Sequence, residues 1–244
     1  MYLAALKPPS CHPFPVTTKL APTSLLDRVV YTYTDVDRHL GLHWGTSRRW
    51  LNGYVRAGTE YPPVLREGPT GSDAVTWGEF VETRLLSEFR DHGVSLQRLR
   101  PAVQQLRKEF GRYPLAHARP FLDVEGRELV LQIQDEVGLP EELRFVVVRN
   151  GQGMITSPVK RFVDVVDFAN EGTAMRILPG GRGSAVVIDP QRQSGRPVVR
   201  SVPTDVVLEQ FNAGESIAAI SDLWELTATE IESALRFELT SRAA

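Results

Sequence analysis

The chain has 244 residues, of which 42% are hydrophobic and 24% charged, an ordinary composition for one large or two small globular domains. Cys11 is the only cysteine, which excludes an intrachain disulfide bond and fits a reducing compartment, so we expect a cytoplasmic protein. The apolar run 1–6 is too short for a secretion signal, and no run approaches the ~20 residues needed to cross a bilayer. We therefore expect no membrane association.

The net charge of −2 conceals two stretches of opposite charge. Residues 90–119 contain seven basic and two acidic side chains, a local charge of +5, whereas residues 201–244 contain eight acidic and two basic ones, a local charge of −6. A basic patch can attract phosphate, although charged runs are more often solvated helix faces. The sequence leaves both interpretations open.

The N-terminal half is predicted to be helical. A Pro-rich extended arm occupies residues 1–25, and a helix capped by Thr34 follows at 33–40, before Gly41. A second helix is expected at 44–54, a Gly- and Pro-rich loop or small hairpin at 57–75, and longer apolar-striped helices at 76–92 and 95–110.

The second half begins with β-type patterns and ends in helices. Runs of alternating or continuous apolar residues predict strands at 129–133, 145–148, 154–155, 162–166, 174–178 and 185–188, with a Gly-rich linker at 179–184. Three short helices are expected at 204–212, 217–223 and 229–237, the last capped by Thr227 with Glu230 three residues later.

The second predicted helix has the side chains of a DNA-recognition helix. Such a helix needs cationic and hydrogen-bonding groups outside and apolar anchors behind. The candidate DNA contacts are Thr46, Arg48, Arg49, Asn52 and Arg56, and the candidate anchors are Trp44, Trp50, Leu51 and Tyr54. Arginine can bind guanine O6 and N7 bidentately or bind phosphate, but it can also simply solvate a helix.

Two resemblances come from the ends of the chain. The run Tyr33-Thr34-Asp35-Val36 to Leu40-Gly41-Leu42, followed by Thr46-Ser47-Arg48-Arg49-Trp50, resembles the opening helix-turn-helix of MerR-like regulators. The segment Gly195-Arg196-Pro197-Val198-Val199, Pro203-Thr204 and Ala213-Gly214-Glu215-Ser216-Ile217 resembles a small domain of unassigned function found in bacterial antitoxins, with Ser201-Val202 where that family has Thr-Arg.

Together, these features make the whole chain similar to two-domain VapB-type antitoxins. The resemblance implies a protein that binds and neutralises a VapC-type ribonuclease with a PIN domain and represses its own operon. A PIN site is a carboxylate cluster that holds a divalent cation, so an inserted arginine could pair with it. Candidates are Arg192, Arg196 and Arg200, for which DNA phosphate or solvent are equally open alternatives.

We therefore predict an α+β fold with no enzymatic activity and no cofactor, and we expect a homodimer, since two-fold partners double the base contacts. The expected divisions are an arm (1–25), a helical MerR-like helix-turn-helix domain (26–120), a β-rich middle and linker (121–183), and a C-terminal three-helix, helix-turn-helix-like domain (184–244).

Metal or catalytic chemistry finds little support in the sequence. His39 and His43 are four residues apart but have no nearby third ligand, and Cys11-His12 has no partner acid. The Gly-rich run 179–184 lacks the Gly-Lys-Ser/Thr ending of a phosphate loop. The main alternative is a MerR-like regulator that senses a metabolite in its middle region and has no toxin partner.

Overall fold

The computed structural model describes residues 24–90 and 95–242. Almost all of the expected arm, with Cys11 and His12, lies outside the described residues. None of the helices in the described ranges combines the length and the apolar character that a membrane crossing requires.

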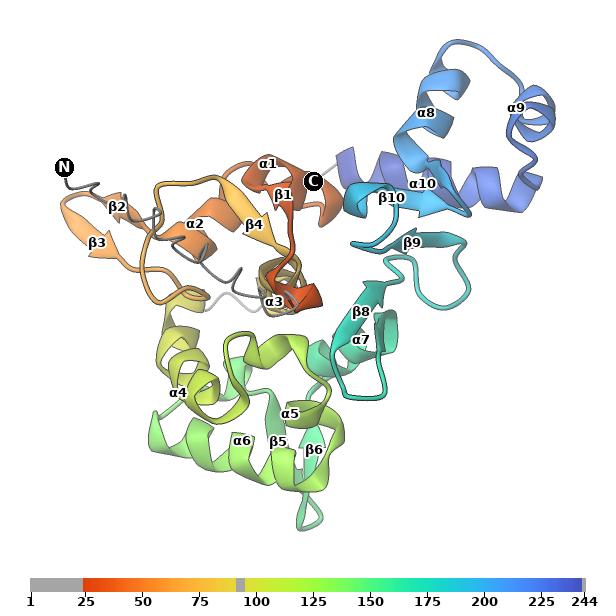
Figure 1. The fold of residues 1–244 in the computed structure, drawn as a ribbon. Coiled ribbons are helices and arrows are strands. Elements are labelled where there is room, and N and C mark those ends of the chain that lie inside the picture. The colour runs from red at the N-terminus through yellow and green to blue at the C-terminus, as the bar shows by residue number, and fades with distance from the viewer. Residues whose placement is uncertain (1–23, 91–94, 243–244) are drawn as a thin grey trace, which may run out of the picture.

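The N-terminal unit joins two short helices, a hairpin and one long buried helix (Figure 1). Its elements are η1 (Leu25–Asp27), β1 (Val29–Thr32), α1 (Tyr33–His39), α2 (Thr46–Asn52), β2 (Tyr54–Arg56), β3 (Thr59–Tyr61), β4 (Ala74–Thr76) and α3 (Trp77–Ser87). Strand β1 pairs antiparallel with β4, and β2 pairs with β3. The three helices expected here are present, whereas the hairpin begins at Tyr54, within the predicted second helix, and not at residue 57.

Capping boxes set the starts of α1 and α3. Thr32, and not the expected Thr34, caps α1, because the Thr32 side chain and Asp35 exchange hydrogen bonds with each other's backbone amides. Thr76 and Glu79 make the same arrangement at the start of α3. In both cases the carboxylate also lies in the first turn, where the helix dipole favours a negative charge.

The middle of the chain contains more helix than the sequence predicts. Its elements are η3 (Leu96–Leu99), α4 (Arg100–Phe110), η4 (Pro114–Ala116), α5 (Arg119–Leu122), α6 (Val124–Glu136), η5 (Glu141–Leu143), β5 (Val146–Arg149), β6 (Gln152–Ile155) and α7 (Ser157–Val165). The strands predicted at 129–133 and 162–166 are wrong: the first lies within α6 and most of the second within α7.

The burial pattern explains the error in α6. Val130, Ile133 and Gln134 are buried, while Leu129 and Leu131 are only partly covered, so burial follows the helical three-to-four spacing. The continuous apolar run hides this period, which is why a short run can be mistaken for a strand.

A five-stranded antiparallel sheet connects the middle of the chain to its C-terminal unit. The strand order is β11-β10-β9-β8-β7, and Ile177 of β8 faces Ile188 of β9 across the join. Its strands are β7 (Val166–Phe168), β8 (Ala174–Ile177), β9 (Val186–Ile188), β10 (Pro197–Val199) and β11 (Val202–Pro203). The helices α8 (Thr204–Asn212), α9 (Ile217–Trp224) and α10 (Ala228–Arg242) follow, close to the three expected ones.

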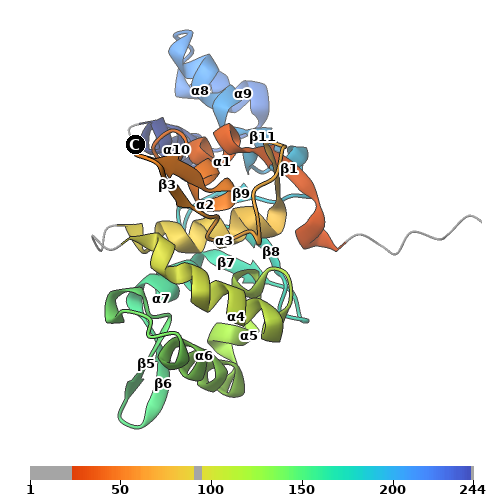
Figure 2. The same ribbon diagram turned by 90° about the vertical axis from the view of Figure 1, so that its left-hand side faces the viewer.

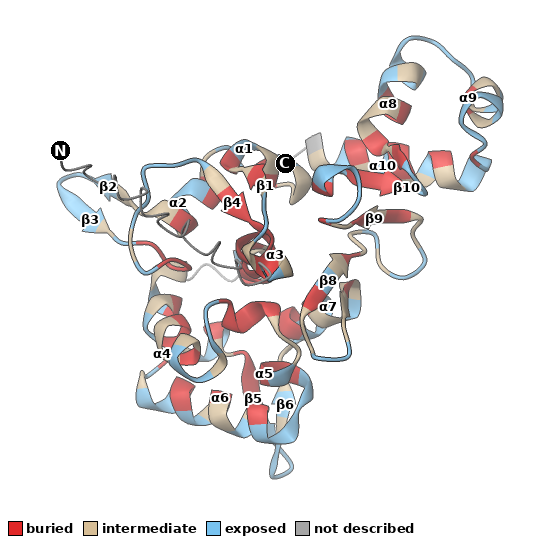
Figure 3. Cartoon of the chain, viewed as in Figure 1, coloured by how far each residue is buried: buried red, intermediate tan, exposed pale blue. Residues whose placement is uncertain are grey.

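Two hydrophobic cores result (Figure 3). The larger core extends from Leu26 to Ile188 and crosses the expected boundary at residues 120 and 121 without a break. The smaller core lies among β9, β10 and α8–α10, and Phe237 of α10 packs against both. Figure 2 shows α10 beside α1, and α8 and α9 at the end of the molecule opposite to the β5–β6 hairpin.

Candidate nucleic-acid interface

The turn between α1 and α2 is held by one buried carboxylate. Asp37 Oδ2 accepts a hydrogen bond of 2.6 Å from the backbone N–H of Gly45, and Oδ1 accepts one of 2.8 Å from that of Ser47. The Ser47 hydroxyl in turn donates to the Tyr33 carbonyl at 3.0 Å. The two helices are thus fixed to each other by polar contacts, and an aliphatic side chain at position 47 could not make the bond to the Tyr33 carbonyl.

Helix α2 exposes two adjacent arginines. Leu51 is completely buried beneath the helix, whereas Arg48 and Arg49 are both exposed. Arg49 Nη2 donates to the hydroxyl of Thr46 at 3.0 Å, which orients this guanidinium along the helix. Within the described residues Arg48 makes no ion pair, so its charge remains available to a ligand.

Two other predicted contacts serve the fold itself. Thr46 is buried and accepts the hydrogen bond from Arg49. Asn52 Oδ1 accepts a hydrogen bond of 2.5 Å from the backbone N–H of Thr70 and so attaches the following loop to α2. These bonds use the acceptor atoms that base recognition would need, so we do not retain Thr46 and Asn52 among the proposed base contacts.

The β2–β3 hairpin follows α2 directly and carries Arg56. The rings of Tyr54 and Tyr61 stack across the hairpin, with centroids 4.6 Å apart and an interplanar angle of 8°. Arg56, at the end of β2, is exposed, as is Val55 beside it. In Figure 1 the hairpin projects next to α2, on the side of the molecule away from α8 and α9. It could therefore contact the same ligand as α2.

Trp44 is a further exposed residue of this surface. The sequence suggests that it anchors α2 to the core, but its side chain is 80% exposed, so that expectation is wrong. Leu42 is the buried apolar residue of this turn instead. A shallow depression next to Trp44 is also lined by Arg48 and Thr34. Trp44 therefore presents a large aromatic ring beside Arg48. The spacing of residues in the sequence could not tell such an exposed tryptophan from one that anchors the helix to the core.

Much of the basic stretch 90–119 supports loops. Arg100 Nε donates to the Pro63 carbonyl at 2.7 Å, and Arg107 donates to the carbonyls of Leu65 and Arg112. Arg112 forms an ion pair with Asp27. These guanidiniums are bound to backbone or carboxylate oxygens of the same chain, which explains the local charge without a nucleic acid.

The three C-terminal arginines are exposed and paired. Arg196 Nη2 lies 2.5 and 2.7 Å from the carboxylate oxygens of Asp205, Arg200 Nε lies 2.8 Å from Glu230 Oε1, and Arg192 Nε lies 3.5 Å from Asp189 Oδ2. Their chemistry already suits carboxylates. The neighbouring guanidinium, together with hydrogen bonding, holds the pKa of Asp205 below its ordinary value against the opposing effect of burial.

The two discounted histidines lie in different surroundings. His39 packs edge-on against Tyr31, with ring centroids 5.7 Å apart, and burial lowers the pKa of His39 to about 4. His43 is exposed in the turn before α2.

Comparison with known proteins places this geometry in a family. The chain is 37% identical over 230 residues to the uncharacterized protein Rv2308 of Mycobacterium tuberculosis, covering 91% of this chain and 95% of that protein. It is 30% identical over 225 residues to the "Putative antitoxin VapB45" of the same organism, covering 86% of this chain and 93% of that protein. The chain belongs to the family of these two proteins.

A solved structure and two family models also match this chain. The crystal structure of Rv2018 from Mycobacterium tuberculosis superposes with a TM-score of 0.69 at 28% identity, covering 86% of this chain and 99% of that one. Residues 29–103 match the model "Putative DNA-binding HTH domain", which extends from β1 into α4. Residues 186–237 match a model described as "Protein of unknown function (DUF433)", which covers the smaller core.

Proposed function

We propose that this member of the VapB45 family is an antitoxin that binds operator DNA through α2 and the β2–β3 hairpin. The observation that carries this proposal is the outward position of Arg48 and Arg49 on a helix whose opposite face is buried through Leu51. Arg48 and Arg49 would read base edges in the major groove, as the recognition helices of MerR-like proteins do. Arg56 and the ring of Trp44 would contact the flanking backbone.

A homodimer is part of the proposal. Helix α2 has only seven residues, so one copy offers too few base contacts for specific binding. Two copies related by a two-fold axis would read an inverted repeat and double the contact area.

The experiment is titration of a duplex from the region upstream of the protein's own gene, compared with a duplex of scrambled sequence. We expect the double variant Arg48→Gln and Arg49→Gln to lose at least about tenfold in affinity for the upstream duplex, since each arginine–guanine pair contributes about 1–3 kcal/mol. The matched control is Arg119→Gln with Arg149→Gln, which removes the same charge from exposed positions outside α2 and its hairpin.

Two outcomes would overturn the DNA part. Unchanged affinity of the α2 double variant would remove this helix from the interface. If the control variant loses as much affinity for the upstream duplex, the effect of Arg48 and Arg49 is explained by net charge alone.

We also propose that the C-terminal unit neutralises a VapC-type ribonuclease, as the name of the related VapB45 suggests. Arg192, Arg196 and Arg200 would exchange their internal carboxylates for those of the PIN site, and Arg192 has the longest internal ion pair of the three. Because ion pairs with the nuclease would replace ion pairs within the chain, binding is favoured only if the arginines lie closer to the nuclease carboxylates than to their present partners.

The test is co-purification with the product of the adjoining gene, followed by an RNA cleavage assay. We expect a stable complex without nuclease activity, and weaker inhibition when Arg192, Arg196 and Arg200 are all replaced by glutamine. Full inhibition by this triple variant would exclude these arginines from the nuclease site. Absence of any complex would favour a transcription regulator without a toxin partner.

A further inference from the structure

Helix α9 has an apolar side that the rest of the chain leaves uncovered. Among its residues Ile217–Trp224, only Ile220 is buried. Leu223 and Trp224 follow Ile220 by three and four positions, so the helical period places them on the same side of the helix. Yet Leu223 is 61% exposed and Trp224 37%, and Figure 1 shows α9 at the outer edge of the C-terminal unit. Exposed apolar groups with a polar border mark interaction sites.

The border of this side of α9 is acidic. Asp222 and Glu225 flank the two apolar residues in the sequence, and both are exposed. Neither carboxylate forms an ion pair with any of the described residues, so the chain itself does not compensate their charge. We call Asp222, Leu223, Trp224 and Glu225 the α9 face.

The acidic character extends beyond α9. Between Arg200 and Arg236 the sequence contains seven Asp or Glu residues and no Lys, Arg or His. Two α9 faces from different copies of the chain would bring like charges together, which opposes self-association. The complementary occupant is a partner protein with a basic surface around an apolar contact.

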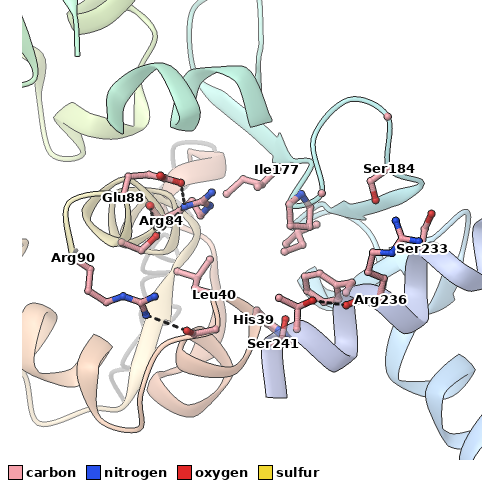
Figure 4. A pocket seen from close by; sticks show the side chains of 18 residues that line it. His39, Leu40, Arg84, Glu88, Arg90, Ile177, Ser184, Ser233, Arg236 and Ser241 are labelled. Carbon is pink, nitrogen blue, oxygen red and sulfur yellow. Dashed lines mark hydrogen bonds and ion pairs between the residues drawn. The ribbon is translucent and has the colours of Figure 1, made fainter. Parts of the chain in front are cut away.

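The arginine that ends the acidic stretch belongs to another surface. Arg236 lines a cavity of about 590 Å³ between α10 and the ends of α1 and α3, and Figure 4 shows it across that cavity from Arg90. None of the described residues of α8 or α9 lines this cavity. Arg236 is therefore not part of the α9 face.

The arginine that precedes the acidic stretch lies beside the α9 face. Arg200 Nη1 donates a hydrogen bond of 3.2 Å to the Glu225 carbonyl at the end of α9, and its Nε lies 2.8 Å from Glu230 Oε1. The C-terminal unit thus presents an exposed arginine next to acidic and apolar side chains. A metal-dependent ribonuclease has the inverse pattern, because carboxylates hold its metal and a basic surface around them binds RNA phosphates.

We propose that the α9 face binds the basic RNA-binding surface of the VapC-type nuclease. Leu223 and Trp224 provide the apolar contact, and Asp222 and Glu225 occupy the places of RNA phosphates. This inference rests on the proposed neutralisation of a nuclease and extends it. Arginine blocks the metal site in the proposed function, whereas the α9 face excludes the RNA strand.

The first experiment measures the affinity of the full chain for the purified product of the adjoining gene. The double variant Asp222→Lys with Glu225→Lys should bind at least about tenfold more weakly, since like charges that meet across an interface are unfavourable. The matched control is Glu141→Lys with Glu142→Lys, which makes the same charge change at exposed positions of η5 and should leave the affinity unchanged. Raising the salt concentration from about 0.1 to about 0.5 M should weaken the wild type more than the α9 variant.

A second variant tests the apolar part of the α9 face. Leu223→Ala should weaken binding about tenfold, because truncation removes apolar area that the complex buries. The control is Val148→Ala on β5, which is 63% exposed and should bind like the wild type. Leu223, Asp222 and Glu225 are all exposed, so their variants should keep the urea midpoint of the wild type.

A displacement assay tests the exclusion of RNA. A fluorescent RNA oligonucleotide is bound to the nuclease in EDTA, which removes the divalent cation and so prevents cleavage. The wild-type chain should displace this RNA. The variant Asp222→Lys with Glu225→Lys should displace it at least about tenfold less effectively.

The outcomes separate this inference from the proposed function. Absence of any complex between the wild-type chain and the nuclease would overturn both. A complex of equal affinity for the wild type, the charge-reversed variant and Leu223→Ala would overturn the α9 face alone. A wild-type dimer that Leu223→Ala dissociates, measured by analytical ultracentrifugation, would assign the α9 face to a second copy and likewise overturn this inference.

Discussion

The phenol of Tyr31 donates a hydrogen bond of 2.7 Å to the carbonyl of Gly195, which lies 164 residues further along the chain. Tyr31 belongs to β1 of the N-terminal unit, and Gly195 lies in the turn before β10 of the C-terminal sheet. A Cβ atom on Gly195 would lie 2.5 Å from Tyr31 Oη, and its φ is +78°. Close contact and backbone conformation therefore both require glycine there.

The first prediction separates these two requirements. Gly181 has the same φ of +78° but open space where its Cβ would be. Gly181→Ala should cost about 1–2 kcal/mol, the penalty of a left-handed residue. Gly195→Ala should cost a further ~1–3 kcal/mol because the methyl group overlaps the Tyr31 ring. Urea denaturation of both variants measures the difference in their free energies of unfolding. Equal decreases in the two variants would show that Tyr31 moves away from the methyl group at no cost.

The second prediction concerns the ion pair of Arg66 and Glu79, which ties the loop after the β2–β3 hairpin to α3. Arg66 Nε and Nη2 lie 2.7 and 2.9 Å from the two Glu79 oxygens, and both side chains are largely buried. Glu79→Gln should cost about 3 kcal/mol, because it leaves a buried guanidinium without its carboxylate. The control is Asp164→Asn in the exposed Lys160–Asp164 pair, which should cost under ~1 kcal/mol. A similar decrease in unfolding free energy in Glu79→Gln and Asp164→Asn would contradict the role of burial.

The third prediction concerns Glu82, which is fully buried in α3. Burial raises the pKa of Glu82 from 4.5 to about 8, against the opposing effects of the Leu115 N–H and of Arg107. Its Oε1 accepts a hydrogen bond from Leu115 at 3.1 Å, while Oε2 has no hydrogen-bond partner among the described residues. The folded state therefore retains a proton that the unfolded state loses above pH 4.5.

Stability should accordingly fall as the pH rises from 4.5 to about 8 and level off above that. His39 acts with the opposite sign, but only between its lowered pKa of about 4 and its ordinary 6.5. His117, whose pKa is also lowered by burial, acts in the same direction as His39. Urea denaturation at pH 6.8 and 8 lies above the ordinary pKa of both histidines, so the change in stability over this interval comes mainly from Glu82. Glu82→Gln should abolish the loss of stability over this interval, whereas the exposed control Glu60→Gln should keep it. If the stability of Glu82→Gln still falls between pH 6.8 and 8, a group other than Glu82 causes the pH dependence.

The fourth prediction concerns Arg56 on the β2–β3 hairpin. If Arg56 binds a phosphate, Arg56→Gln should weaken binding of upstream and scrambled duplexes alike, and should reduce the slope of log affinity against log salt by about 0.9 per subunit. Arg48→Gln should instead affect the upstream duplex more. Titration at several salt concentrations gives both values. A loss confined to the upstream duplex in Arg56→Gln would make it a base contact.

Sequence reasoning located the elements that carry strong local signals. Helices α1, α3, α9 and α10 have polar caps, and α2 and α8 have Gly or Pro at a boundary. These signals depend on neighbours within a few residues. The exposed pair Arg48 and Arg49 could be predicted for the same reason, because the helical period places Arg49 opposite Leu51 and Arg48 at the edge between the two faces.

The tertiary structure decided what depends on distant parts of the chain. It assigned 129–133 to a helix, since which face of a continuous apolar run is buried depends on the core around it. In the folded chain Trp44 is exposed, and the side chains of Thr46 and Asn52 accept hydrogen bonds from other residues of the same chain. The tertiary structure also brought Arg90 and Arg236, 146 positions apart in the sequence, to one cavity. Local periodicity sets the elements, but only packing fixes which side chains remain free to bind.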